Sequence, residues 1–332
     1  MKNSQIIGVG HYVPEQVVTN FDLEKMMDTS NEWIVERTGI RERRWVRLGE
    51  ATIYSMGYEA AQMAIRRAGI QAEEIEFIIV ASITGDHAFP GGGCFLGEKM
   101  GLYGVPAMDI RNACSGFVYG LSVADKFIKT ETYKTVLVIG SEIQSIGIDK
   151  TSRGRDISVI FGDGAGAAIL RATDNPDKGV LTTHLHADGR YAKKLWCDWP
   201  SIHWPPALGK PYDDPEHNFP HMDGRYVFKH AVVKFPQVIN EALQATGYTT
   251  EDVDLLIPHQ ANLRITEAVA QQIGIPMEKV MSNIHLYGNT TAASIPIAMS
   301  EAWEQGKIKE NSLVCLAAFG AGFTWGAALI RF

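Results

Sequence analysis

No stretch of the sequence stays apolar over the roughly 18 to 20 residues that a membrane-spanning helix needs. The first residues, up to Pro14, read as the start of a strand and lack the long apolar core of a secretory signal. Of the 332 residues, 45% are hydrophobic and 21% are charged, enough to bury one large core or two fused halves. We therefore expect a soluble globular protein, with the cytoplasm as its compartment.

Cysteine is scarce, and its few copies are not paired. There is no C-x-x-C motif, which argues against both a disulfide framework and a zinc site; the four cysteines are Cys94, Cys114, Cys197 and Cys315. Three histidines of one segment also fit no compact ligand pattern: His203, His217 and His221. We expect reduced thiols and no metal.

Positive charge is in short supply as well. The formal net charge is −7, the opposite of the basic field with which nucleic-acid binders neutralise phosphates. This balance still allows a local basic patch for an acidic partner.

What the sequence does contain is an alternation of buried strands and amphipathic helices, which is typical of an α/β fold. An internal echo accompanies it: GIQAEEIEFIIV from Gly69 parallels GYTTEDVDLLIP from Gly247. The same displacement relates residues 135–138 to 313–316, and a smaller one relates GAAIL at 166–170 to GAALI at 326–330. The sequence therefore predicts two copies of one α/β unit.

One segment, 188–223, departs from the alternation. It holds three tryptophans and six prolines without sustained periodicity. Such a composition predicts a long ordered loop or cap.

Cys114 lies in DIRNACSGFVYGL, between a predicted strand and a predicted helix. Unpaired N–H groups and the helix dipole at a helix N-terminus stabilise a thiolate, so this position predicts a lowered thiol pKa. The simpler alternative is a small buried hydrophobic residue.

Two further polar residues stand at the ends of buried runs. His259 follows a predicted strand directly, where open α/β sheets present their sites. Asn289 follows Gly288 and opens a helix of small residues. A loop histidine with a satisfied hydrogen bond and a helix N-cap are the alternative interpretations.

Taken together, the motifs resemble β-ketoacyl-acyl carrier protein synthase III, a condensing-enzyme family of the thiolase-like superfamily. The resemblance rests on RNACSGFVYGL, PHQANLRI, YGNTTAASIP, TSNEWIVERTGIRERR, IFGDGAGAA and AFGAGFTWGAALIRF. It implies a five-layered α-β-α-β-α sandwich of two pseudo-symmetric halves, 1–172 and 173–332, with an insertion at about 189–222. It also implies a homodimer.

The resemblance further implies a decarboxylative condensation that initiates fatty acid synthesis. Cys114 would take an acyl group from coenzyme A, and the N–H groups of Cys114 and Ala321 would hold the oxyanion. His259 and Asn289 would stabilise the enolate of malonyl-acyl carrier protein. No cofactor is implied, because the coenzyme A thioester is a substrate.

The resemblance also assigns binding residues around these three. Those expected at coenzyme A are Thr29, Trp33, Arg37, Arg153, Arg225, Phe228 and Asn262. Lys229 and Arg264 would dock the carrier protein. Phe89 would reach across the dimer to the partner's acyl pocket.

Four features depart from the family pattern. Gln271 and Gln272 replace lysine after NLRI, Arg225 replaces a small amide, and TSRGRDISVIFGDG is two residues longer than the short form of its loop. Gly91, Gly92 and Gly93 replace bulkier residues beside Phe89. We expect the glycines to widen the acyl pocket for medium-chain donors; the alternative is a tight turn, with acetyl-CoA as the best donor.

Two other functions stay open at this point. One is a related condensing enzyme of secondary metabolism, or one that uses medium-chain or other acyl donors. The other is an acyl-transfer protein that loads Cys114 and never condenses, for which His259 and Asn289 would be dispensable.

Overall fold

The apolar runs of the sequence form the central strands of two β-sheets in the computed structural model, which describes residues 2–198 and 219–332. The first sheet has the order β1 (Asn3–Tyr12), β7 (Gly164–Thr173), β6 (Thr135–Glu142), β4 (Phe77–Ala81), β5 (Ala107–Ile110). The second has the order β11 (Leu255–Pro258), β12 (Leu313–Gly320), β13 (Thr324–Arg331), β8 (Gly179–Ala187). Strand β4 pairs in parallel with β5 and β6, and β11 with β12; the other pairs are antiparallel.

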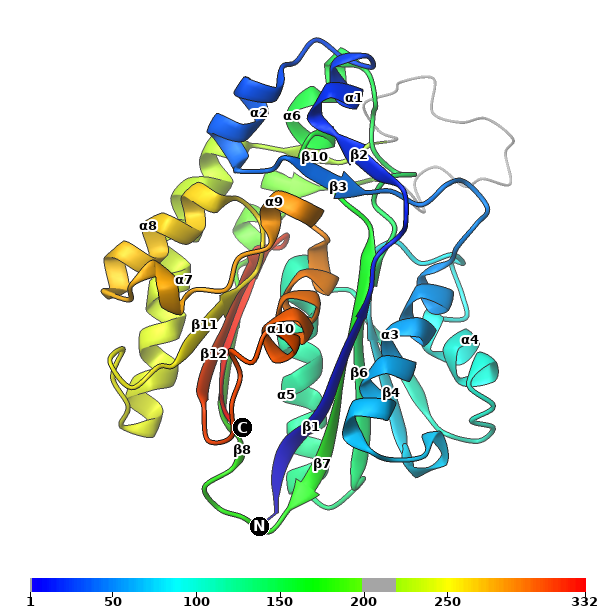
Figure 1. Cartoon of the computed structure of the whole chain (residues 1–332), viewed down its shortest axis with the longest axis vertical. Coiled ribbons are helices and arrows are strands. Elements are labelled where there is room, and N and C mark those ends of the chain that lie inside the picture. Colours follow the sequence, from blue (N-terminus) through cyan, green and yellow to red (C-terminus); the bar gives the residue numbers. More distant parts are fainter. Residues whose placement is uncertain (1, 199–218) are drawn as a thin grey trace.

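Helices form three layers around and between the sheets (Figure 1). Helices α3 (Ile53–Ala68) and α4 (Gly92–Lys99) pack on the outer face of the first sheet, and α7 (Gly224–Thr246) and α8 (Leu263–Ile273) on that of the second. Between the sheets lie α5 (Gly116–Lys129) and α10 (Ser294–Glu304), which share one hydrophobic core with both. The predicted five-layered sandwich is confirmed.

The two halves repeat one topology, as the internal echo predicts. The order β8-β13-β12-β11 repeats β1-β7-β6-β4. Each middle helix begins with a 3₁₀ turn, η2 (Ala113–Ser115) before α5 and η8 (Thr291–Ala293) before α10. The residues before these turns have almost the same backbone angles, φ −95° and ψ 26° at Asn112 and φ −96° and ψ 25° at Thr290. The exact boundary at residue 172 stays a prediction.

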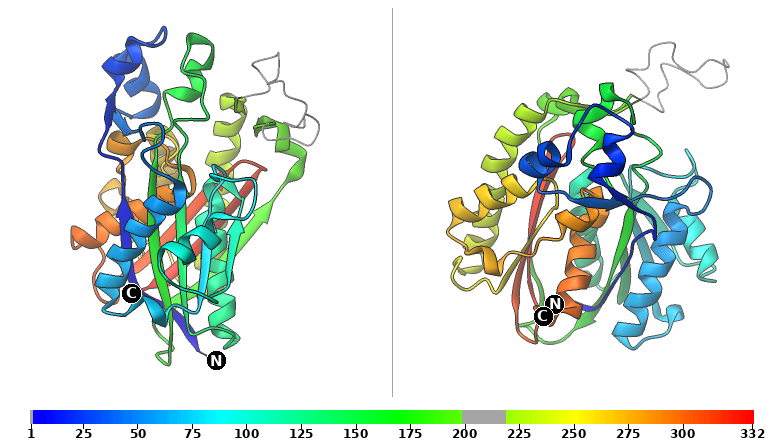
Figure 2. Two further views of the ribbon diagram at one scale, coloured as in Figure 1. Left: turned by 90° about the vertical axis from the view of Figure 1, so that its right-hand side faces the viewer. Right: turned by 45° about the horizontal axis from the view of Figure 1, so that its top comes forward.

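A small cap stands over one end of the sandwich, at the top of Figure 1 and in both views of Figure 2. It contains β2 (Val17–Thr19), α1 (Asn20–Glu24), α2 (Asn31–Thr38), β3 (Glu42–Arg44), α6 (Arg155–Ser158) and α9 (Ile284–Tyr287). It has a hydrophobic cluster of its own that includes Leu23, Ile34 and Trp45. Short 3₁₀ turns complete the remaining connections: η1 (Ala72–Glu74), η3 (Ser152–Gly154), η4 (Gly189–Lys194) and η7 (Met277–Lys279).

The tryptophan- and proline-rich segment is only partly within the described residues. Its two ends pair as a ribbon of β9 (Leu195–Trp196) and β10 (His221–Met222). Its predicted role as a cap depends on residues 199–218, which lie outside the described residues, as do His203 and His217. Within the described ranges, none of the helices has the length and apolar character needed to cross a membrane.

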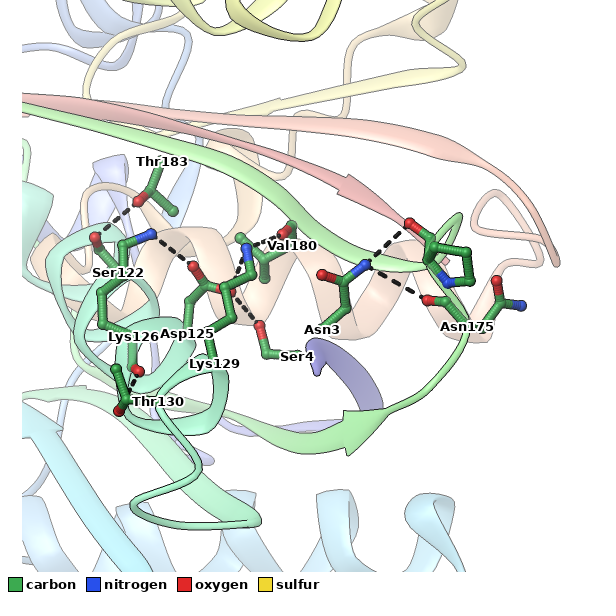
Figure 3. Close-up of polar contacts among 11 residues, drawn as sticks. Asn3, Ser4, Ser122, Asp125, Lys126, Lys129, Thr130, Asn175, Val180 and Thr183 are labelled. Atoms are coloured by element: carbon green, nitrogen blue, oxygen red, sulfur yellow. Dashed lines mark hydrogen bonds and ion pairs between the residues drawn. The ribbon is translucent and has the colours of Figure 1, made fainter. Parts of the chain in front are cut away.

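A buried carboxylate links the middle layer to both sheets at the end opposite the cap (Figure 3). Asp125 of α5 is fully buried; it accepts a hydrogen bond from Ser4 Oγ of β1 at 2.5 Å and forms ion pairs with Lys126 and Lys129. The Lys129 ammonium also donates to the Val180 carbonyl of β8 at 2.9 Å. These contacts join the outer strands of the two halves through a single helix.

We predict that Asp125→Ala destabilises the protein by about 3 to 5 kcal/mol, because it leaves the buried Ser4 hydroxyl without its acceptor and the Lys129 ammonium without its carboxylate partner. Urea unfolding measures this. Lys126→Ala is the matched control, since its side chain is mostly exposed and its ion pair contributes about 1 kcal/mol or less. Equal stability losses in the two variants would contradict the assignment.

Candidate active site

The three predicted catalytic residues come together between the two sheets, below the cap. Cys114 belongs to the 3₁₀ turn that joins β5 to α5, His259 follows β11, and Asn289 stands two residues before the turn that starts α10. Residues with positive φ precede or follow them: Ala113 has φ 45° and Thr291 has φ 51°. Left-handed backbone is costly for a β-branched threonine, and such conformations concentrate at functional sites.

Glycines let the two halves meet at this point with their backbones in contact. A Cβ atom on Gly320, the last residue of β12, would stand 2.7 Å from the Cβ of Cys114. A Cβ on Gly140 of β6 would stand 2.3 Å from the carbonyl oxygen of Ala292. Each turn therefore packs against a central strand of the opposite half, and Ala321, next in the chain after Gly320, lies beside Cys114.

Asn289 is held on both sides of its backbone and through its side chain. Its N–H donates to the Ile160 carbonyl at 2.9 Å, and its own carbonyl accepts from Gly162 N–H at 3.0 Å. Its Oδ1 accepts from Thr291 N–H at 2.8 Å. The amide group can then donate to the thiol of Cys114, and this hydrogen bond opposes the rise of the thiol pKa.

His259 is buried, with 2% of its surface exposed, and is neutral. Burial lowers the pKa of its imidazole to about 3. Its Nδ1 lies 2.6 Å from Ser294 Oγ, and that oxygen accepts from Gln260 N–H at 3.4 Å. The serine hydroxyl is thus free to donate to Nδ1, which assigns the ring proton to Nε2.

The Nε2 atom of His259 is buried and has no hydrogen-bond partner within residues 2–198 and 219–332. An unsatisfied buried donor is costly and rare in native proteins, so it calls for an explanation. A substrate carbonyl oxygen in the space between Cys114, His259 and Asn289 would satisfy it.

The expected low pKa of Cys114 is wrong for the protein without substrate. Burial raises the pKa of the thiol to about 12, and the negative charge of Glu142 acts in the same direction. Desolvation outweighs the favourable helix terminus because only 6% of the Cys114 surface is exposed. Cys114 therefore rests as a neutral thiol.

Glu142 was not predicted as a site residue. It ends β6, is fully buried, and accepts hydrogen bonds from Ser82 Oγ, from Thr84 Oγ1 and from the N–H groups of residues 83 and 84, at 2.6 to 3.2 Å. Burial raises the pKa of its carboxyl to about 7. The sequence signal was an acid shortly after the apolar run VLVIG at 136–140.

The coenzyme A residues expected from the resemblance gather in and around the cap. Trp33 on α2 has two cations over its ring, Arg37 at 4.5 Å and Arg155 at 4.7 Å from the ring centroid. Arg153 instead forms an ion pair with Asp149 at 2.6 Å. Arg155 was missed, although it belongs to the same lengthened loop as Arg153.

Helices α2, α7 and α8 bring the remaining predicted binding residues together. Asn262 caps α8 and donates to the Arg37 carbonyl at 2.8 Å, which ties α8 to α2. Arg264 lies over the Phe228 ring, with 5.9 Å to its centroid. Arg225, Lys229 and Arg264 are exposed on this side. Thr29 carries a buried hydroxyl without a partner in the described part of the chain.

The three glycines at the start of α4, Gly91 as its N-cap and Gly92 and Gly93 in its first turn, have a reason unrelated to pocket width. The carboxylate of Asp109 accepts from Gly92 N–H at 2.6 Å and from Gly93 N–H at 3.0 Å. A Cβ at Gly91 would stand 2.4 Å from that carboxylate, and one at Gly93 2.9 Å from the Ala107 Cβ. The missing side-chain volume is therefore already filled by β5 and its aspartate.

No cluster of three or more histidine, cysteine, aspartate or glutamate side chains within the described ranges could hold a metal ion. The groups that the candidate site does contain are the thiol of Cys114, the neutral imidazole N–H of His259 and the amide of Asn289. That set can form and cleave a thioester and can stabilise two different oxyanions.

Comparison with known proteins agrees with this reading. Two family models match, 3-oxoacyl-(acyl-carrier-protein) synthase III over residues 108–189 and its C-terminal counterpart over 243–332. The chain is 47% identical to the β-ketoacyl-(acyl-carrier-protein) synthase III of Escherichia coli strain K12 over 331 residues, 99% of each protein.

Solved structures are similar over the whole length. The 3-oxoacyl-(acyl-carrier-protein) synthase III of Aquifex aeolicus VF5 is 43% identical with a TM-score of 0.91, covering 99% of this chain and 100% of that one. The priming β-ketosynthase of the R1128 polyketide biosynthetic pathway is 30% identical with a TM-score of 0.91, covering 100% and 96%.

The electrostatics of the site predict that Glu142→Gln lowers the pKa of the Cys114 thiol, because it removes the negative charge that disfavours the thiolate. Alkylation of Cys114 by iodoacetamide, followed by peptide mass spectrometry across pH 6 to 10, measures the effect. Each unit of pKa lost raises the thiolate fraction, and thus the alkylation rate, about tenfold below the pKa.

Asp163→Asn is the matched control, since Asp163 is an equally buried carboxylate that bonds to Ser145. It should leave the alkylation profile of Cys114 unchanged. An unchanged profile in a folded Glu142→Gln variant would contradict the electrostatic link.

Proposed function

The chain belongs to the 3-oxoacyl-(acyl-carrier-protein) synthase III family, and we propose on this premise that it condenses an acyl-CoA starter with malonyl-acyl carrier protein. The product is a β-ketoacyl-acyl carrier protein, which initiates fatty acid synthesis. The observation that carries the proposal is that the Asn289 amide donates to the Cys114 thiol, while the buried Nε2–H of His259 has no partner among the described residues.

In the first half-reaction, the sulfur of Cys114 attacks the thioester carbonyl of acyl-CoA. The oxyanion of the tetrahedral intermediate accepts hydrogen bonds from the backbone N–H groups of Cys114 and Ala321. Coenzyme A leaves as a thiol, so the proton of Cys114 ends on the coenzyme A sulfur. The raised pKa of Cys114 means that this proton moves during acylation and is not lost beforehand.

Acylation frees the Asn289 amide from the Cys114 sulfur for the second half-reaction. The malonyl thioester carbonyl accepts from Asn289 Nδ2–H and His259 Nε2–H, and carbon dioxide leaves as the enolate forms. The enolate carbon attacks the acyl carbonyl, the Cys114 thiolate departs, and a proton from water returns it to the thiol. No step abstracts a proton from malonate, which suits an imidazole whose pKa is about 3.

Substrate entry follows from the exposed cations of the cap and of the neighbouring helices. Coenzyme A would bind at Trp33 with its adenine between the ring and an arginine, and its phosphates would meet Arg37 and Arg225. The acidic carrier protein would dock on Lys229 and Arg264. Gln271 and Gln272 are exposed and neutral, so the far end of α8 adds no charge to this surface.

The glycines no longer support a preference for medium-chain donors. Their space is filled by Asp109 and β5, so we propose that acetyl-CoA is the best donor. A role in secondary metabolism stays the second candidate, supported by the likeness to the R1128 priming β-ketosynthase. The non-condensing alternative is disfavoured because it leaves the buried Nε2–H of His259 without a use.

A homodimer is part of the proposal. Strand β5 is the outer strand of the first sheet, and its neighbourhood carries exposed apolar side chains that include Met108, Tyr103 and Phe89, the last with 86% of its surface exposed. Open strand edges and apolar patches of this kind are usually covered by a partner. Pairing of two β5 strands would bring Phe89 to the partner's acyl pocket.

We predict a dimer in sedimentation equilibrium for the wild-type protein and a shift toward monomer for Met108→Asp, because a charge would enter the pairing edge. Val233→Asp, at an exposed apolar residue of α7, is the control and should remain dimeric. A monomeric wild-type protein would refute this part of the proposal.

The two half-reactions should separate in the variants His259→Ala and Asn289→Ala. Each should still acquire an acyl group, while decarboxylation of malonyl-acyl carrier protein should fall about 10² to 10³-fold per lost oxyanion donor. Intact mass spectrometry with acetyl-, butyryl- and octanoyl-CoA follows acylation, with acetyl expected to react fastest, and carbon dioxide release follows decarboxylation.

Cys114→Ala is the control for the acyl adduct and should show none, whereas Cys94→Ala should be acylated normally. An adduct on Cys114→Ala would place the nucleophile elsewhere. Equal losses of acylation and decarboxylation in His259→Ala would favour a general-base role for His259 over the donor role.

A further inference from the structure

The largest fully buried side chain of the described residues is a charged one, Arg43 of β3. Burial lowers the pKa of its guanidinium to about 10, so it stays charged at neutral pH. The charge of the neighbouring Glu42 partly opposes this shift, while the Nε of Arg43 has no hydrogen-bond partner within residues 2–198 and 219–332. Burying an uncompensated charge is expensive, so the contacts that Arg43 does make require an explanation.

Those contacts hold two chain segments of the cap, residues 18–20 and the segment that starts at Val159, against β3. Nη1 donates to the Val18 carbonyl at 3.2 Å and to Asn20 Oδ1 at 2.8 Å, and Nη2 donates to the Val159 carbonyl at 2.8 Å. Two of the acceptors precede or begin α1, and the third starts the segment 159–162. The planar guanidinium suits this task because it directs several donors at fixed angles.

The segment 159–162 is the one that holds Asn289. Ile160 accepts the N–H of Asn289, and Gly162 donates to its carbonyl, so this segment flanks Asn289 like a neighbouring strand. Gly162 and Gly288 both lie against the Arg43 side chain: a Cβ on them would stand 3.2 and 3.6 Å from the Arg43 Cβ. Arg43 is thus packed directly behind the backbone that carries the Asn289 amide.

The hydrogen bonds of Arg43 also reach the elements that form the predicted coenzyme A site around Trp33. Strand β3 follows α2, which carries Trp33, and segment 159–162 follows α6, which carries Arg155. These elements lie together over the sheet ends in Figure 1. Helix α2, which carries Trp33, leads to Arg43 itself within ten residues. Helix α6, which places Arg155 over the Trp33 ring, leads to the Val159 carbonyl that Arg43 holds.

We infer that Arg43 is a positioning residue for Asn289: by holding the Val159 carbonyl against β2 and α1, it sets the register in which segment 159–162 presents the Asn289 amide to the reacting thioester. The inference rests on the proposed function for its catalytic readout, because it assigns Arg43 to decarboxylation and not to acylation. A second readout, on the Cys114 thiol, does not depend on that function.

The test uses Arg43→Lys and Arg43→Met in the full-length protein. In Arg43→Met we expect acylation of Cys114 by acetyl-CoA to stay within about threefold of wild type and decarboxylation to fall at least about 30-fold, part of the 10² to 10³ that a lost donor costs. Arg43→Lys keeps the charge and one donor and should recover part of the loss. If Arg43→Met does not fold, Arg43→Lys carries the test, with a smaller loss expected in decarboxylation alone.

The second readout is the pH profile of Cys114 alkylation without substrate. The Asn289 amide favours the thiolate, so its displacement should move the profile of the Arg43 variants to higher pH. General destabilisation of the fold would expose the thiol and move the profile in the opposite direction.

Arg67→Lys and Arg67→Met are matched controls. Arg67 is a partly buried arginine of α3 that also donates to a backbone carbonyl, that of Val9 at 3.0 Å, and it lies outside the cap. Its variants should leave both readouts unchanged.

Unchanged decarboxylation and an unchanged alkylation profile in folded Arg43 variants would overturn the inference, and so would equal losses in both half-reactions. If the wild-type protein itself released no carbon dioxide, the proposed function would fail. The alkylation profile alone would then decide on Arg43, an upward shift supporting its role and no shift overturning it.

Discussion

The site exists because two halves of one duplicated chain touch backbone to backbone at the centre of the molecule. Gly320 leaves no room for a side chain against Cys114, and Gly140 leaves none against Ala292. Any larger residue at either glycine would separate a turn from the strand it packs on, and the distance between the thiol and the donors of the second half would grow. At the other end of the sandwich, the packing of the two middle helices and the hydrogen bond from Ser4 to Asp125 hold the two halves together and so maintain this contact.

Burial at this contact decides the protonation states on which the chemistry depends. It holds His259 neutral and Cys114 protonated, and it brings the pKa of Glu142 close to neutral pH. A low-dielectric site strengthens each hydrogen bond to an oxyanion, and the same property makes a free thiolate unfavourable before substrate arrives. Cys114 therefore becomes reactive only when the thioester enters the site. The carbonyl oxygen of the thioester then takes up the negative charge, and its leaving sulfur takes up the proton of Cys114.

The sequence was sufficient for the architecture, whereas the catalytic roles of the three central residues stay a prediction. The echo of Gly69 in Gly247 reflects the repeated strand order, and Cys114 and His259 both follow predicted buried strands. The thiol pKa was predicted with the wrong sign, because local sequence reveals a helix terminus but not how many atoms cover it. Arg155 over Trp33, and Asp109 beside the glycines, depend on contacts between distant segments that no periodicity encodes. Arg43 gave no signal, since an arginine in a charged run reads as an exposed residue.

The duplication also explains how the roles are divided between the halves. In the two equivalent turns, Cys114 of the first half corresponds to Ala292 of the second. The displacement that relates Gly69 to Gly247 also relates Ala81 to His259 and Gly116 to Ser294. In the first half, Ala81 and Gly116 pack closely, with a Cβ on Gly116 only 3.1 Å from that of Ala81. In the second half the same backbone positions carry the hydrogen bond between His259 and Ser294. One backbone arrangement therefore supplies the nucleophile from one copy and the oriented imidazole from the other. Ala81 stands where the second half has His259, and Ala292 where the first half has Cys114, so at these two positions the small counterpart leaves room for the two turns to approach each other.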